Sequence, residues 1–306
     1  MGTLDKQRIV DPVLTNLARG YSNDGFVANM LFPLATVTKE GGKIPQFTKE
    51  AFKIYNTERA IRADSNRINP SVNDSIDFVL TEHDLEYPMD YREINESVLP
   101  LKMHATNVVT EAIALRKEKL AADLAINTAN YASTNKLALG SGDHFDESTS
   151  DPIGVIDTAR SAVRSQIAKN PNVIIIPNSV FVALKNHAAI TDKVKYTQHA
   201  VITAQLLKQL LQFDALYVAN GVYEDSSGAL VDVWGESIVM AYVPEAKNGS
   251  RSFYEPSYGY TLQMKNFPIV DTYDEKGKIK VVRNTDLFVP KIVGADAGYL
   301  ISNCLA

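Results

Sequence analysis

Side chains that could bind a metal ion or act as a nucleophile are few in this sequence and are spread along it. None of the five histidines stands in the H-x-x-x-H or H-E-x-x-H spacing of a zinc site. The one cysteine, Cys304, is interpreted as a small apolar residue near the end of the chain. Residues 143–147 (D-H-F-D-E) could hold a hard cation weakly, but a plain acidic loop is the favoured interpretation. The sequence therefore predicts no metal site and no catalytic cysteine.

Motifs for phosphate binding and for acyl transfer are also missing. The sequence contains no G-x-x-x-x-G-K-[ST] loop, no G-x-G-x-x-G loop and no G-x-S-x-G turn. Acidic residues are plentiful, and two of them could meet in the fold as a general acid and base, but the sequence selects no pair. We predict no catalytic residue and no cofactor. One alternative stays open, an α/β enzyme whose site is assembled without a recognisable motif.

The composition is that of a globular protein with no strong attraction for nucleic acid. Of the 306 residues 45% are hydrophobic and 22% are charged, and the formal net charge is −5. A protein that wraps DNA needs a basic surface, whereas one that only encloses DNA does not. The sequence has neither the apolar core of a signal peptide nor a stretch of about 18 apolar residues, and one cysteine fits a reducing compartment. We expect synthesis in a cytoplasm and no membrane contact.

The first third of the chain predicts extended elements that cannot form a core alone. Glycine, proline, asparagine and aspartate interrupt residues 1–38, which predicts an arm with two short helical pieces. Residues 39–92 predict a long hairpin, because strand-like runs near 43–47, 76–80 and 85–91 flank a polar stretch. A two-stranded hairpin is marginally stable in water, so this one needs a surface to lie on.

Charge is segregated within this hairpin. Basic residues outnumber acids from 39 to 67, and acids outnumber basic residues from 74 to 93. A basic tip beside acidic strands could complement a second copy of the chain, although a merely solvated loop is the other interpretation. The residues that we single out for contact between subunits are Lys49, Lys53, Arg59, Arg62, Arg67, Asp74, Asp77, Glu82 and Asp84.

A long helix and an α/β unit follow the hairpin. Apolar residues at three- to five-residue steps over 95–130 predict a helical rod of roughly 50 Å. A loop rich in glycine, serine and acids over 135–152 indicates a domain boundary. Further helices are predicted at 153–168, 180–187 and 200–211, and strands at 173–176, 215–218, 231–234, 237–243, 258–264, 269–273, 278–283, 287–292 and 298–302.

The order of these segments is similar to that of one known family. The most specific stretches are N-V-I-I-I-P-N-S-V-F-V-A-L at 172–184, a strand, turn and helix, and D-L-F-V-P at 286–290. Over nearly its whole length the chain resembles the major capsid proteins of tailed double-stranded-DNA bacteriophages, which have the Hong Kong 97 fold. The resemblance implies an α+β structural subunit of a virion rather than an enzyme.

The resemblance also implies a division of the chain and a set of partners. Residues 1–38 would be the N-terminal arm, 39–92 the extended loop over a neighbouring subunit, 93–152 the peripheral domain with its spine helix, 153–250 the inserted axial α/β domain, and 251–306 the closing strands of the peripheral domain. Copies would assemble in the host bacterial cytoplasm into hexamers and pentamers of an icosahedral head enclosing double-stranded DNA. A scaffold, a portal and a decoration protein would be further partners. A nanocompartment (encapsulin-like) shell protein shares the fold and is the second alternative.

Overall fold

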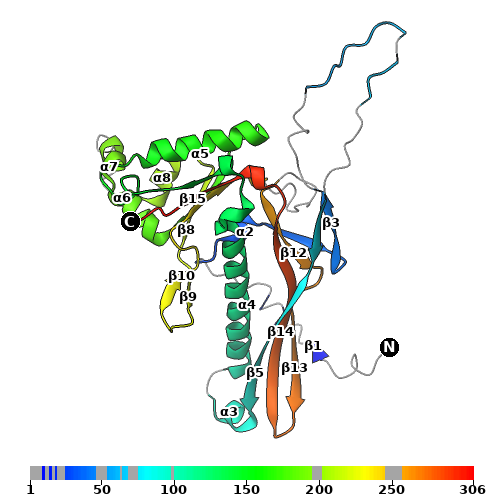
Figure 1. Cartoon of the computed structure of the whole chain (residues 1–306). Coiled ribbons are helices and arrows are strands. Elements are labelled where there is room, and N and C mark those ends of the chain that lie inside the picture. Colours follow the sequence, from blue (N-terminus) through cyan, green and yellow to red (C-terminus); the bar gives the residue numbers. More distant parts are fainter. Residues whose placement is uncertain are drawn as a thin grey trace.

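The chain folds into a mixed α+β structure with two main sheets, one long helix and one projecting loop (Figure 1). The computed structural model describes residues 9–10, 14–15, 18, 25–45, 54–62, 64–67, 75–97, 100–194, 202–244 and 257–306. A five-stranded sheet with its helices forms one part of the molecule, and a six-stranded sheet beside the long helix forms an elongated second part (Figure 1).

The long helix α4 covers Leu101–Ile126 and is about 39 Å long at 1.5 Å per residue. The prediction of a single helix over 95–130 is wrong at both ends. Pro100 is the residue before α4, because proline has no N–H to donate and disfavours helical conformation in the residue that precedes it. A separate short helix, α3 (Tyr91–Glu96), comes first and begins at a capping box that includes the Asp90 carboxylate.

Small side chains let α4 pack closely against the rest of the molecule. Ala105 lies in a buried cluster with Val282, and Ala121 lies in the cluster around Trp234. The helix ends at Ile126, where the side chain of Asn127 accepts the N–H of Ala129 and begins a 3-10 helix, η2 (Thr128–Asn130). An Asx-type turn of this kind offers the backbone an alternative to continuing the helix, which explains why it stops short of 130.

The six-stranded sheet has the order β1-β13-β14-β12-β2, and β5 pairs with the other edge of β14. The two strands predicted at 278–283 and 287–292 form one strand, because β5 pairs with β14 from Ile279 to Phe288 without a break. A hairpin turn joins β13 to this strand, with Gly277 at a φ of 95° that glycine adopts without strain. The strands are β1 (Ile9–Val10), β2 (Leu34–Val37), β5 (Thr81–Asp90), β12 (Gly259–Met264), β13 (Ile269–Glu275) and β14 (Ile279–Ile292).

The five-stranded sheet has the order β6-β15-β11-β7-β8. The predicted helix at 153–168 and the predicted strand at 173–176 are both present. Strand β15 comes from the C-terminal end of the chain and pairs with β11 and β6, so the last residues lie in the same sheet as β7. The elements are β6 (Lys136–Ala138), α5 (Pro152–Ile167), β7 (Val173–Pro177), α6 (Asn178–Asn186), α7 (Ala188–Val194), α8 (Ala204–Leu210), β8 (Ala215–Ala219), β11 (Ile238–Ala241) and β15 (Gly298–Ser302).

Strand β7 is buried on both faces, as its unbroken run of β-branched residues predicts. Ile174 and Ile176 point into the core beneath α5 and α6, whereas Ile175 points into a second core that contains Trp234. All three isoleucines are completely buried. One strand therefore joins the two apolar cores that hold this part of the molecule together.

Shorter elements complete the fold. The hairpin β9–β10 projects beside α4, and the ribbon β3–β4 is the base of the projecting loop (Figure 1). The strands predicted at 43–47, 76–80, 85–91 and 231–234 are present with bounds shifted by a few residues. The remaining elements are α2 (Ala28–Leu31), β3 (Gly41–Pro45), β4 (Ser75–Val79), η3 (Ser133–Asn135), β9 (Val222–Glu224), β10 (Leu230–Asp232) and η4 (Ala295–Ala297).

Candidate assembly surfaces

The projecting loop, residues 41–79, is anchored to the body at its base. Strands β3 and β4 pair in antiparallel register, with Gly42 opposite Phe78 and Lys43 opposite Asp77. On the inner side, Ile44 and Phe78 are buried in a cluster with Tyr260 of β12. On the outer side, the Lys43 Nζ lies 3.7 Å from the Asp77 carboxylate, with the two side chains 71% and 77% exposed. Apolar burial therefore fixes the base of the loop, since so exposed an ion pair adds about 0–1 kcal/mol.

The loop tip, which we define as residues 54–67, lies far from the body (Figure 1). Side-chain hydrogen bonds hold its shape. The Asn66 amide donates to the carbonyl oxygens of Asn56 at 2.8 Å and Glu58 at 2.9 Å, and the Asn56 side chain accepts the Glu58 N–H at 3.0 Å. Arg62 at the turn has a φ of 68°. All the tip residues that the structure describes are exposed to solvent.

The structure separates the predicted contact residues into three groups. The arginines Arg59, Arg62 and Arg67 are exposed on the tip. The tip projects away from β5 (Figure 1), so the tip arginines and the acids of β5 come together only if two copies of the chain meet. The acids that the structure describes are Asp77 on β4 and Glu82 and Asp84 on β5, while Lys49, Lys53 and Asp74 lie outside the described residues.

Strand β5 presents acids on one face of the six-stranded sheet. Glu82, Asp84 and Glu86 alternate along the strand and are exposed. Thr285 on the paired strand donates to the Asp84 carboxylate at 3.1 Å, and partial burial raises the pKa of Asp84. Glu86 was not among the predicted contact residues, although its position two residues after Asp84 in a strand places it on the same face.

One arginine lies among these acids. Arg283 of β14 donates to both carboxylate oxygens of Asp271 at 3.0 and 2.6 Å and lies 3.5 Å from Glu86. The hydroxyl of Tyr273 donates to Glu86 at 2.7 Å, and this hydrogen bond raises the pKa of Tyr273 to about 12. We call Glu82, Asp84, Glu86 and Asp271 with Arg283 the acidic sheet face. Asp271 is 4% exposed and is paired with Arg283, so the three exposed acids of β5 give this face its negative charge and favour a basic partner.

The N-terminal segment is joined to α4 by a buried carboxylate. Glu118 is 2% exposed and accepts the N–H groups of Val27 at 2.9 Å and Ala28 at 2.8 Å. It also accepts the indole N–H of Trp234 at 2.7 Å. Burial raises the pKa of Glu118, although its three hydrogen bonds oppose that shift. One side chain of α4 thus holds the start of α2 and the only tryptophan of the chain in place.

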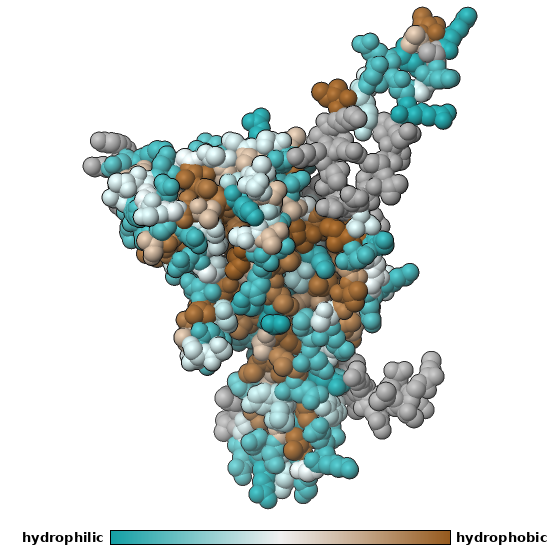
Figure 2. Space-filling view, viewed as in Figure 1, coloured by the Kyte–Doolittle hydropathy of each residue, from teal (hydrophilic) through white to brown (hydrophobic). Residues whose placement is uncertain are grey.

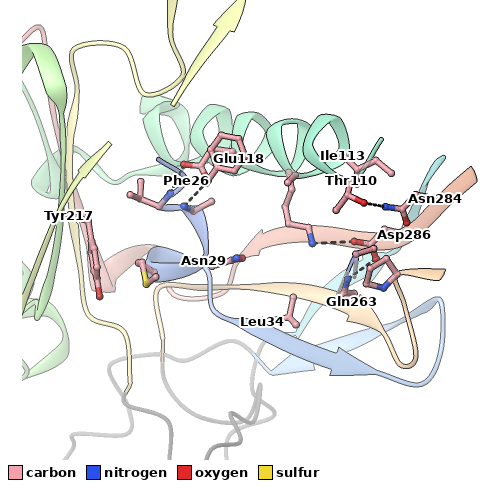
Figure 3. Close-up of a pocket in the computed structure, with 17 residues that line it drawn as sticks. Phe26, Asn29, Leu34, Thr110, Ile113, Glu118, Tyr217, Gln263, Asn284 and Asp286 are labelled. Atoms are coloured by element: carbon pink, nitrogen blue, oxygen red, sulfur yellow. Dashed lines mark hydrogen bonds and ion pairs between the residues drawn. The ribbon is translucent and has the colours of Figure 1, made fainter. Parts of the chain in front are cut away.

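A cavity of about 520 Å³ opens beside this carboxylate, between α2, α4 and the six-stranded sheet (Figure 3). Its polar groups already have partners in the chain for the most part. Asp286 accepts from Lys117 at 3.2 Å and from Gln263 at 2.6 Å, and the Asn284 amide donates to Thr110 at 3.0 Å. The described lining residues include no pairing of a nucleophile with a base. The polar groups that line the cavity therefore serve mainly to hold α2, α4 and the six-stranded sheet together.

A buried serine and histidine lie together like two of the three members of a catalytic triad. The Ser150 hydroxyl lies 3.2 Å from Nε2 of His187. However, Nδ1 of His187 accepts the N–H of Ala189 at 3.1 Å, so the proton of the neutral ring is on Nε2, which donates to the Glu147 carbonyl at 2.9 Å. A nitrogen that carries a proton cannot remove one from serine. The pair closes the loop before α5, and sequence reasoning did not find it.

Cys304 is completely buried in the core beneath α5, and burial raises the pKa of its thiol to about 12, which makes it a packing residue. Among the residues that the structure describes, no group of three or more histidine, cysteine or acidic side chains could hold a metal ion. None of the helices in the described ranges has the length and apolar character needed to cross a bilayer.

The architecture is that of a building block. Two apolar cores stabilise the body, a shaped loop projects from it, and an acidic face lies open on its sheet, whereas no described cluster has the geometry of an active site. Within the described residues these features favour a subunit of a larger assembly over a self-contained catalyst.

Comparison with known proteins identifies the kind of assembly. Residues 62–285 match the family described as phage major capsid protein E. The major capsid protein of Burkholderia phage BcepMu is 51% identical over 303 residues, which is 99% of each chain. The crystal structure of a phage-related protein from Bordetella bronchiseptica RB50 is 30% identical, with a TM-score of 0.84 over 97% of this chain and 98% of that one. The chain belongs to the phage major capsid protein family, and it is a structural subunit of the capsid shell.

Solved structures with low identity share the fold alone. The mature capsid of bacteriophage PhiM1 is 12% identical with a TM-score of 0.56, over 94% of this chain and 90% of that chain. The encapsulin of Synechococcus elongatus PCC 7942 is also 12% identical, with a TM-score of 0.52, over 96% and 95% of the two chains. The encapsulin-like alternative thus has a shared fold in its favour, whereas the matches in sequence reported above are to phage proteins, and the capsid is better supported. The family to which the chain belongs is a structural one, which gives the enzyme alternative no support.

Proposed function

We propose that this subunit assembles with copies of itself into hexamers and pentamers of an icosahedral phage head that encloses double-stranded DNA. The observation that carries the proposal is the projecting loop, whose shaped and exposed tip lies beyond the reach of its own body (Figure 1). A net charge of −5 supports enclosure of DNA without tight binding, because a surface that neutralised phosphates would have to be basic. Such a head would be built in the cytoplasm of the host bacterium and become part of the virion.

The division of the chain follows from the Hong Kong 97-like fold that we propose for it. Residues 39–92 would be the extended loop, α4 the spine helix of the peripheral domain, and 153–250 the axial domain whose tips meet at the centre of each hexamer or pentamer. Residues 1–38 would be the N-terminal arm, and the strands of 251–306 would complete the peripheral domain. Since β15 pairs with β11, the last strand would also brace the axial domain.

We further propose that the tip of the extended loop lies against the acidic sheet face of a neighbouring subunit. The predicted contact residues support this arrangement, because Arg59, Arg62 and Arg67 are exposed on the tip and Glu82 and Asp84 are exposed on β5. Single pairs of this kind are weak, yet a closed shell repeats them many times and turns weak contacts into cooperative assembly. A separate scaffold protein, a portal and a decoration protein would be the other partners.

Reversal of charge tests the proposed contact. The triple variant R59E/R62E/R67E should weaken assembly while each subunit stays folded, because all three side chains are exposed on the tip. Electron microscopy counts the shells, and fluorescence of Trp234 reports folding of the body. Normal shells from the triple variant would contradict the proposed contact, whereas an unfolded body would show that the tip has a role inside its own chain.

A further inference from the structure

We infer that the loop tip binds a second copy of this chain mainly by burying Ile54 and Ile61, with the arginines forming a polar surround. This inference rests on the proposed function, because it names the residues that make the proposed contact hold. Opposite charges attract the tip to a neighbouring subunit, and burial of the two isoleucines supplies most of the binding affinity.

The first observation is exposure. Ile54 is 96% exposed and Ile61 is 94% exposed, while the isoleucines of β7 are completely buried. Tyr55 beside them is also exposed. Figure 2 shows isolated hydrophobic groups on an otherwise hydrophilic tip. Single exposed apolar residues are ordinary on a surface, but two nearly bare isoleucines on one shaped loop leave apolar area that only another molecule can cover.

The second observation is that the tip already has a fixed form. The hydrogen bonds from Asn66 to Asn56 and Glu58 tie the two sides of the loop together on either side of Ile61. A turn that is shaped before binding loses less conformational entropy when it binds. The network therefore presents Ile61 as an anchor, in the way that a few buried side chains dominate most protein interfaces.

The third observation is that charge alone gives the tip little attraction. Among the described tip residues, three arginines stand against Glu58 and Asp64, a net charge of only +1. Exposed ion pairs contribute little each and are screened by salt. Burying an isoleucine removes apolar area from water and is not weakened by salt, so the isoleucines supply the larger share of the affinity.

A second copy of this chain is the partner that fits. The tip is remote from its own body, and a contact between unlike surfaces of two copies is what closes a ring of subunits. The acidic sheet face offers such a copy the opposite charge to the arginines. A membrane surface fits less well, because a net charge of only +1 gives the described tip residues little attraction for anionic lipid headgroups.

The test compares two sets of neutral substitutions in the full-length chain. The double variant I54S/I61S should raise the subunit concentration at half-assembly at least tenfold, as loss of two buried isoleucines implies. The matched control R59Q/R62Q/R67Q should raise it less than threefold, and that smaller effect should shrink further in high salt. Light scattering follows assembly, while Trp234 fluorescence and urea unfolding should be the same for all variants. A double variant that assembles at the wild-type concentration, or a control that is equally impaired, would overturn the inference.

A photo-crosslink identifies the occupant. Benzoylphenylalanine in place of Ile61, in a mixture of ¹⁴N- and ¹⁵N-labelled chains, should give crosslinked peptides of mixed isotope in assembled particles. Crosslinks within one chain, or crosslinks to another protein alone, would overturn the inference while leaving the capsid function intact. Wild-type chain that forms no particle under any condition would instead contradict the proposed function, and the proposed anchors would fall with it.

Discussion

Strand β7 and the loop tip use the same amino acid in opposite ways. In β7, Ile174, Ile175 and Ile176 are completely buried between two cores, and on the tip, Ile54 and Ile61 are almost completely exposed. Each buried isoleucine stabilises the folded subunit by about 1.5–3 kcal/mol, whereas an exposed one contributes nothing to the subunit by itself. Apolar burial therefore stabilises the body, whereas the apolar side chains of the tip are left uncovered within the subunit.

The comparison is tested most directly by replacing one isoleucine with alanine in each region and measuring the free energy of unfolding. Ile175→Ala should reduce the free energy of unfolding by about 3 kcal/mol, because it leaves a cavity beside Trp234 in a packed core. Ile61→Ala should change it by less than about 0.5 kcal/mol. Urea unfolding of unassembled subunits measures both. Equal effects at the two positions would mean that the tip packs on its own body, contrary to the comparison.

A second test asks whether the hydrogen bonds that Glu118 accepts stabilise the folded body of the subunit. Glu118→Ala leaves the N–H groups of Val27, Ala28 and Trp234 without their acceptor, so it should cost about 2–3 kcal/mol of folding stability. The exposed Glu111 on the same helix gives the matched control, since Glu111→Ala should be close to neutral. Trp234 emission should shift to the red only in the first variant. If the emission spectrum of Glu118→Ala is the same as that of wild type, the Glu118 carboxylate does not position Trp234.

The same carboxylate predicts how stability depends on pH. Burial raises the pKa of Glu118 above its ordinary value of 4.5, so the folded state keeps the proton at a pH where the unfolded chain has lost it. Its contribution to stability is therefore fully present below pH 4.5 and is lost as the pH rises through the raised pKa. Wild type should lose stability relative to Glu118→Gln over that window, which urea midpoints at a series of pH values would reveal. A difference that is constant with pH would contradict the predicted direction.

The smallest effect is expected at the base of the loop. Lys43→Ala removes an ion pair with Asp77 in which both side chains are mostly exposed, so stability should change by less than about 1 kcal/mol. Phe78→Ala on the inner side of the same ribbon should cost several times more, because Phe78 is buried against Tyr260. Thermal unfolding of the two variants compares them directly. A larger loss from Lys43→Ala would mean that charge, not apolar burial, anchors the loop.

Local patterns in the sequence predicted the elements whose cause is local. The helix predicted at 153–168 and the strand predicted at 173–176 are where the patterns place them. The long helix was predicted with the wrong bounds, because apolar spacing does not fix where helical hydrogen bonding begins and ends, which Pro100 and the turn at Asn127 determine.

Features that depend on distant parts of the chain could not be predicted. Glu118 stands in the charged run R-K-E-K, which is typical of a solvated helix face, yet its three donors come from segments about 90 and 116 residues away. The arginines at 59, 62 and 67 were singled out by charge, but the exposure of Ile54 and Ile61 is visible only once the loop is seen apart from the body. A sequence pattern gives the type and local spacing of residues, whereas the burial of a residue depends on which distant segments pack against it.

The central claim is that this chain builds a closed shell, and electron microscopy of the purified protein after size-exclusion chromatography tests it most directly. The account predicts closed particles, tubes or ring-shaped capsomers, with the Ile54 and Ile61 variants requiring a higher protein concentration to form them. A monodisperse monomer that stays monomeric at high concentration, and when produced together with other phage head proteins, would contradict it.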